Sequence, residues 1–373
     1  MDELTQPYLE KKLTLYEARG GSGQTNKAGE LGSRGPEEQK SSDENTLSIS
    51  FSPLLPRSSA PQLRGSHVLP RPLAPSDIPR PPFWGSRVAR GISLKDVFNY
   101  INETALLKVR WGFSRGKTSA AEYQKLMDEK VQPLFRKWKD YCLKQQLLVP
   151  QVVYGYFPCL SDGDDLVIYE PEDLKKEWVR FTFPRQKETP QRCISDFFTP
   201  SPPNPSPLSM ERGVKTLEVK PSPYSRERVA KPGEGGFDVF GCSIVTVGTQ
   251  ASDKEHKLFK ENAYSDYLFL HGLGVETAEA LAELWHRRMR EELGIAGEDS
   301  PNIRDWFHQQ YRGGRYSFGY PACPNLEDQK KLFELLDPGR INVSLSEEFQ
   351  LVPEQSTSAI VVHHPEAKYF NVG

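Results

Sequence analysis

The stretch from Arg315 to Asn325 combines a planar cation with a rigid turn. Its sequence is Arg-Tyr-Ser-Phe-Gly-Tyr-Pro-Ala-Cys-Pro-Asn. A glycine between two aromatic residues, followed by two prolines around Ala-Cys, fixes the directions of the backbone amides and carbonyls. The Arg315 guanidinium is suited to gripping a carboxylate through two parallel hydrogen bonds. Such a segment fits a small zwitterion, with the arginine on its carboxylate and backbone carbonyls or acids on its ammonium group.

Each candidate residue also has a purely structural interpretation. Residue type and spacing alone favour an exposed loop cation for Arg315 and a core ring for Tyr320. Glu279 and Glu283 lie one helical turn apart, and this spacing favours solvated acids over a ligand-facing pair. Cys323 lies between two prolines without a histidine nearby in the sequence, which favours a structural thiol over a nucleophile.

Motifs for metal or nucleotide chemistry are missing from the sequence. Asp162, Asp164 and Asp165 lack the glutamate that closes a calcium loop, so we interpret them as a tight turn. The pair His363-His364 has no obvious partner ligands and is expected to serve in packing or at the surface. No dinucleotide-binding glycine motif, P-loop, H-E-x-x-H or G-x-S-x-G is present. We therefore predict neither a metal site nor a catalytic residue in this chain.

Composition excludes several classes of protein. The 373 residues carry a net charge of −2, and 37% are hydrophobic, which indicates neither a nucleic-acid-binding protein nor a membrane protein. The acidic N-terminus does not resemble a secretory signal, and no long apolar run predicts a transmembrane helix. The five cysteines are scattered without C-x-x-C spacing. We therefore expect buried, reduced thiols and a cytoplasmic location.

Two regions have the composition of disordered chain. Residues 1–81 are rich in Pro, Gly and Ser, and their last part, from Pro70 to Pro82, is expected to be an extended spacer. Residues 199–236 hold eight prolines between Pro200 and Pro232 and are expected to be a disordered insertion. One domain is therefore predicted over residues 82–373, interrupted by this insertion.

Hydrophobic periodicity predicts the elements of that domain. Helical spacing is found at residues 92–109, 119–148, 263–293 and 328–336. Alternation or β-branched runs predict strands at residues 152–157, 165–169, 178–183, 240–247, 341–345 and 357–362. Ser119 and Glu122 form a candidate capping box, and Pro133 should kink or split the helix that follows. Because there is no βαβ rhythm, the pattern predicts an α+β fold around an antiparallel sheet.

Several segments together resemble the activation domain of cobalamin-dependent methionine synthase. The most specific are Arg315–Pro324 and His364–Tyr369. The others, which occur in the same order as in that family, are Pro82–Gly85, Val153–Pro158, Gly163–Leu166, Ser195–Phe198 and Ala278–Glu283 with His286. The resemblance implies a single curved domain with a central twisted antiparallel sheet flanked by helices.

The resemblance also implies a function. Domains of this family bind S-adenosylmethionine in a shallow groove that faces a cobalamin domain. A flavodoxin-like protein or another flavoprotein reductase reduces inactive cob(II)alamin, and S-adenosylmethionine then supplies the methyl group. Cobalamin would come from a partner, because this chain lacks the Asp-x-His-x-x-Gly signature of a cobalamin domain. Positioning is the expected contribution of the activation domain, and it can supply a large part of a rate enhancement.

Six positions match residues near the ligand in that family. They are Arg315 for the methionine carboxylate, Ser317 and Tyr320 in the turn, Glu279 on the long helix, Tyr369 near the C-terminus, and Asn102. Asn102 departs from the pattern, because the family has an aspartate there. If that acid pairs with a cationic part of the ligand, its replacement should weaken binding by roughly 1–3 kcal/mol.

Two hypotheses follow from the resemblance. In the first, the chain supports reactivation of a cobalamin-dependent methyltransferase, in trans or as part of a larger assembly, and so participates in methionine biosynthesis. In the second, it is a non-catalytic module that senses S-adenosylmethionine or holds a corrinoid protein. A vestigial ligand groove is a third, weaker interpretation. Methyl transfer to reduced cobalamin distinguishes the first two, whereas ligand binding alone does not.

Overall fold

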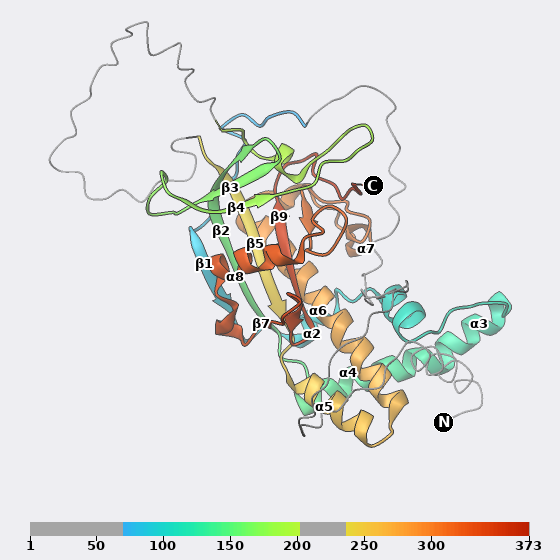
Figure 1. Ribbon diagram of the computed structural model, residues 1–373. Coiled ribbons are helices and arrows are strands. Elements are labelled where there is room, and N and C mark those ends of the chain that lie inside the picture. Colours follow the sequence, from blue (N-terminus) through green and yellow to red (C-terminus); the bar gives the residue numbers. More distant parts are fainter. Residues whose placement is uncertain (1–69, 202–235, 373) are drawn as a thin grey trace, which may run out of the picture.

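The computed structural model describes residues 70–201 and 236–372. Its centre is a seven-stranded sheet in the order β4-β3-β2-β5-β9-β6, with β1 also paired to β2 (Figure 1). The strands are β1 (Gly85–Ala89), β2 (Gln151–Asp162), β3 (Asp165–Tyr169), β4 (Glu177–Thr182), β5 (Asp238–Thr246), β6 (Gly314–Tyr316) and β9 (Ser356–Val362). All of these pairings are antiparallel, which confirms the predicted α+β class. The short strands β7 (Ser344–Leu345) and β8 (Leu351–Val352) form a separate pair.

Strand β2 organises the sheet because it pairs along both of its edges. One edge runs beside β5, and the other pairs first with β1 and then with β3. Its side chains alternate between two hydrophobic clusters, with Val152 and Tyr154 in one and Val153 and Phe157 in the other. Both faces of the sheet are therefore covered. A Cβ atom on Gly155 would lie 2.5 Å from the Gly85 carbonyl oxygen, so this crossing point requires glycine.

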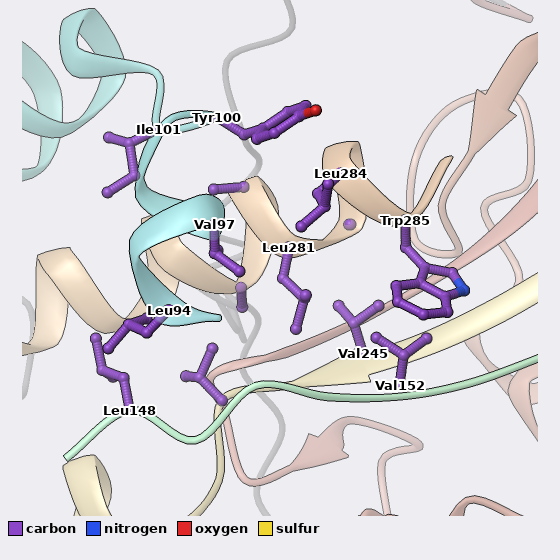
Figure 2. Packing of buried hydrophobic residues seen from close by; sticks show 14 of the residues in the cluster. Leu94, Val97, Tyr100, Ile101, Leu148, Val152, Val245, Leu281, Leu284 and Trp285 are labelled. Atoms are coloured by element: carbon purple, nitrogen blue, oxygen red, sulfur yellow. The ribbon is translucent and has the colours of Figure 1, made fainter. Parts of the chain in front are cut away.

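Helix α6 (Tyr264–Glu292) packs against one face of the sheet (Figure 1). Leu281 and Trp285 on α6 lie over Val152 of β2 and Val245 of β5, as Figure 2 shows. The remaining helices are α2 (Leu94–Phe98), α3 (Ala120–Leu126), α4 (Gln132–Gln145), α5 (Gln250–Lys260), α7 (Ile303–Trp306) and α8 (Gln329–Leu336). Helix α8 contributes Leu332 to the cluster on the opposite face. No helix within the described residues is long and apolar enough to cross a membrane.

The helix predicted over residues 119–148 is split, as expected from Pro133. Helix α3 begins at a complete capping box formed by Ser119 and Glu122. A π-helical turn at Met127–Val131 separates α3 from α4, and Pro133 lies in the first turn of α4, where a missing N–H is tolerated. The long helix predicted over residues 263–293 is α6, and Gly294 follows it with a positive φ of 72°.

Several boundaries differ from the sequence-based expectations. The helix predicted over residues 92–109 is interrupted: α2 ends at Phe98, and a π-helical segment then covers Thr104–Arg110. The strand predicted over residues 341–345 is reduced to β7, because Pro338–Ile341 forms a 3₁₀ turn. Strand β1 and helix α5 were not predicted, since β1 (Gly-Ser-Arg-Val-Ala) has few apolar residues and α5 is strongly polar.

The segment 70–81 is part of the packed structure rather than only a spacer. Ile78 is buried in the cluster beneath α6. The His364 ring donates from Nε2 to the carbonyl oxygen of Arg71 at 3.0 Å, and the Arg71 amide donates to Glu366 at 3.4 Å. The rest of the predicted tail, 1–69, and residues 202–235 of the predicted insertion lie outside the described residues.

Candidate ligand site between helix α6 and the turn after strand β6

Arg315 lies at the centre of strand β6, opposite Val361 of β9. Gly313, the residue just before β6, has a φ of +87°, and a Cβ atom there would lie 2.2 Å from the carbonyl oxygen of Val362. Only glycine can bring the chain this close to β9 in this conformation. The sheet thus fixes the backbone of Arg315, while the Arg315 side chain reaches toward α6.

Two acids on α6 face the Arg315 guanidinium. Arg315 Nη2 lies 3.7 Å from Glu279 Oε2 and 3.6 Å from Glu283 Oε2. The side chains are mostly buried, with 15% of Arg315, 19% of Glu279 and 9% of Glu283 exposed. The solvated acids and the exposed cation that spacing alone favoured are therefore wrong. The helical spacing of the two acids instead presents both to one buried cation.

Burial and charge act against each other in this cluster. Desolvation works to lower the pKa of Arg315, but Glu283 and Glu279 outweigh it, and the pKa is raised above its ordinary value. Burial raises the pKa of Glu283, although the nearby charge of Arg315 partly opposes this shift. Arg315 Nη1 and Glu283 Oε1 are buried without a hydrogen-bond partner in the described part of the chain. The site thus contains charged groups that could still form hydrogen bonds.

The turn after β6 is tied by backbone and thiol contacts. The Gly319 amide donates to the Cys323 carbonyl at 3.0 Å, and the Cys323 amide donates to the Tyr320 carbonyl at 2.9 Å. The Cys323 thiol is buried and donates to the Ser317 carbonyl at 2.9 Å. Gly319 has a φ of +85°, which this tight geometry requires. Cys323 therefore has the structural role that the sequence favoured, and it holds Ser317 in the turn.

Tyr320 is half-buried and lies in neither hydrophobic cluster. The core position favoured by residue type is therefore wrong. Its pKa is raised by burial and then by the negative charge of Glu279. Arg315 acts on the pKa of Tyr320 in the opposite direction. Tyr320 thus lies within the electrostatic influence of both charged residues.

Tyr369 approaches the same turn from the C-terminal segment. Its amide donates to Gln309 Oε1 at 2.7 Å, and its ring stacks on Tyr316 with centroids 6.3 Å apart. Burial, followed by the effect of Cys323, raises the pKa of the Tyr369 phenol to about 12. Tyr369 therefore lies beside the Ser317–Cys323 turn.

Asn102 is connected to α6 through its backbone rather than to Arg315. Its Oδ1 accepts a hydrogen bond from the Ala105 amide at 3.2 Å, as a helix-capping side chain does. The Asn102 backbone bonds Glu276, which also accepts from Arg110 Nε at 2.8 Å. Glu276 lies one turn before Glu279 on α6, so Asn102 borders the cluster.

Two further polar residues on α6, His286 and Arg290, extend the site inward. No role could be assigned to them from residue type and spacing. His286 is buried with its ring 4.9 Å from that of Tyr311, and both ring nitrogens lack hydrogen-bond partners in the described structure. Burial, aided by the charge of Arg290, lowers the pKa of His286 well below its usual value. Arg290 is itself buried and pairs with Asp299 at 2.8 Å. The spacing of three and four residues along a buried helix was the available signal.

The remaining candidates have structural roles. Arg180 pairs with Asp162 at 3.1 Å and with Asp165 at 3.0 Å, which confirms a tight turn rather than a cation loop. His363 is buried and bonds Asp238 at 2.6 Å, which confirms the packing interpretation. No cluster of potential metal ligands occurs in residues 70–201 or 236–372. The five cysteines are free and buried, as predicted.

Comparison with known proteins finds a matching family model and related sequences. Residues 212–373 match the family model of the vitamin B12 dependent methionine synthase activation domain. The chain is 43% identical over 306 residues to methionine synthase of Mycobacterium tuberculosis and 42% identical over 306 residues to that of Mycobacterium leprae. Both alignments cover 79% of this chain, which spans only 23% of the length of either relative.

A solved structure has the same fold. The crystal structure of the MetH reactivation domain bound to AdoHcy matches with a TM-score of 0.63 over 79% of this chain and 83% of that chain, at 24% identity. The resemblance seen in the sequence is thereby confirmed: residues 212–373 match the family model of the vitamin B12 dependent methionine synthase activation domain, and the fold is that of the MetH reactivation domain.

Proposed function

We propose that this chain binds S-adenosylmethionine beside Arg315 and supports reductive remethylation of cob(II)alamin in a methionine synthase. The observation that carries the proposal is the mostly buried Arg315, held between Glu279 and Glu283 next to a rigid turn, with Nη1 free of partners among the described residues. AdoHcy in the structural relative is the demethylated form of the proposed ligand. The chain would act in trans or within a larger assembly, as a component of a methyltransferase.

The residues present fit the amino-acid end of this ligand. Arg315 would bind the carboxylate with its guanidinium, and Glu279 offers a carboxylate for the ammonium group. Tyr320 adds an aromatic face for the base or sulfonium, and the backbone of the Ser317–Cys323 turn lies alongside. These groups would bind and orient the methyl donor, and no nucleophile from this chain is needed. Cobalamin, carried by a partner module, would supply the nucleophile for the methyl group.

The partners follow from the same proposal. They are the cobalamin-binding modules of a methionine synthase and a flavodoxin-like or other flavoprotein reductase that supplies the electron. We expect neither nucleic acid nor membrane among the partners, and a cytoplasmic location remains a prediction. The non-catalytic alternative is supported by Asn102, whose neutral amide serves as a helix cap where the family has an acid.

Calorimetric titration of the full chain with S-adenosylmethionine tests the ligand, with Arg315→Ala as the variant. We expect saturable binding that the variant loses, because Arg315 is the main carboxylate partner. Unchanged binding by the variant would contradict the assigned site.

Methyl transfer from labelled S-adenosylmethionine to a reduced, separately prepared cobalamin module then distinguishes the two functions. Transfer supports reactivation, whereas binding without transfer supports the non-catalytic module.

A further inference from the structure

Arg315 occupies a midway position between two carboxylates without a close bond to either. Its Nη2 lies 3.7 Å from Glu279 and 3.6 Å from Glu283. A guanidinium that pairs fully with one carboxylate approaches to about 2.7–2.9 Å and uses two N–H groups. Arg110 and Glu276, on the same side of α6, form such a close contact at 2.8 Å. The near-equal, long distances show that Arg315 lies close to both acids and pairs tightly with neither.

The two acids differ in their surroundings. Glu279 is the more exposed and affects the pKa of Tyr320 in the turn. Glu283 is the more buried and affects the pKa of Tyr311, deeper along α6. Glu279 is therefore the outer acid, nearer to solvent, and Glu283 is the inner acid. The proposed ligand would contact the outer acid and not the inner one.

We propose that Glu283 is a positioning residue that holds Arg315 away from Glu279 and so keeps both free for the ligand. This inference rests on the proposed function. Without the inner acid, the guanidinium would close onto Glu279, and each would satisfy the other. The ligand would then have to break a formed ion pair in order to bind its carboxylate and ammonium groups. The unpartnered Arg315 Nη1 and Glu283 Oε1 fit a cation held in an unsaturated position.

The test is a double-mutant cycle in the full chain, read by calorimetric titration with S-adenosylmethionine. We expect Glu283→Gln to raise the dissociation constant about tenfold or more, because it releases Arg315 onto Glu279. Adding Glu279→Gln should then cost less affinity than the same substitution costs in the wild type, since Arg315 has already closed onto Glu279 and taken it from the ligand. A residue that only supports the fold would not give this coupling. Glu292→Gln removes the same charge elsewhere on α6 and should bind like the wild type.

The outcomes separate the inference from the function on which it rests. Wild-type binding with Glu283→Gln unchanged within about twofold overturns the inference alone. A double variant whose loss equals the product of the two single losses also overturns it. Absence of binding by the wild type overturns the proposed function together with the inference. Thermal unfolding of each variant establishes that it is folded.

A second substitution covers the case in which Glu283→Gln does not fold. Glu283→Asp keeps the negative charge and shortens the side chain by one methylene. The inference expects this variant to bind S-adenosylmethionine within about threefold of the wild type, because the inner charge is retained. A folded Glu283→Asp protein with a loss of more than about tenfold would overturn it.

Discussion

At the scale of single residues, the chemistry of the site depends on what surrounds each charge. Arg315 and Glu283 are costly to bury alone, and each offsets the desolvation of the other. Removal of one partner would leave an uncompensated buried charge. Arg315 could be proposed as a ligand residue from the sequence through the turn that follows it and the family resemblance of that segment. The burial of Glu283 was not, because an i, i+4 pair of acids has the same pattern on an exposed helix face.

Asn102 gives a prediction at the residue scale. We expect Asn102→Asp to keep the bond to the Ala105 amide, because a carboxylate caps a helix as well as an amide does. If the family's acid pairs with a cationic part of the ligand, S-adenosylmethionine should bind more tightly by about 1–3 kcal/mol. Calorimetric titration at constant ionic strength measures this change. Asn102→Ala is the control, which should lose about 1 kcal/mol of stability and gain no affinity.

At the scale of elements, strand β6 carries Arg315 on only three residues. We expect Gly313→Ala to destabilise the fold by about 2 kcal/mol or more, because it combines a positive φ with a close contact to the Val362 carbonyl. Urea unfolding measures this loss. Gly297→Ala is the matched control, since its Cβ would meet no atom within 4 Å. A loss of equal size in both variants would contradict this account of β6.

The contact between helices α5 and α6 should depend on pH. Burial works to lower the pKa of His271, but its bond to Glu255 at 3.1 Å outweighs this effect, and the pKa is raised. Glu354 also favours the charged ring, whereas Arg110 opposes it. A raised pKa in the folded state stabilises the fold fully below about pH 6.5, and this stabilisation is lost as pH rises through the folded-state pKa.

The corresponding variant is His271→Gln. The difference in unfolding free energy between the wild type and this variant should be larger at pH 5.5 than at pH 8.5. Urea unfolding at the two pH values measures it. A difference that is constant with pH would show that the imidazole charge contributes nothing to the contact between α5 and α6.

Elements with strong periodicity were predictable, and short or polar ones were not. Helix α6 and strands β2, β3 and β5 could be predicted because each is rich in apolar residues that the fold buries. Strand β6 did not, since three residues carry no measurable period and its place beside β9 is set by tertiary contacts. The capping box predicted the start of α3, and the proline predicted the division between α3 and α4, because those signals are local.

At the scale of the whole molecule, the segment before β1 closes one side of the fold. Its residues were assigned to a tail from proline content, which reports backbone stiffness but not packing. Ile78 is 7% exposed, and the Arg71 backbone bonds His364 and Glu366 near the C-terminal segment that carries Tyr369. The N-terminal part of the described structure therefore supports the C-terminal part of the candidate site.

This arrangement predicts a difference between two truncated chains. A protein of residues 70–373 should be more stable than one of residues 82–373 by about 2 kcal/mol, roughly the contribution of one buried isoleucine. The shorter protein should also bind S-adenosylmethionine more weakly, because His364 loses its partner and the segment leading to Tyr369 loosens. Urea unfolding and calorimetric titration of both proteins measure these effects.

Ile78→Ala in the longer protein separates the contribution of packing from that of the hydrogen bond. This variant should be less stable, but it should keep the bond between His364 and Arg71 and therefore the affinity for S-adenosylmethionine. Equal stability of the two truncated chains would contradict a packing role for residues 70–81.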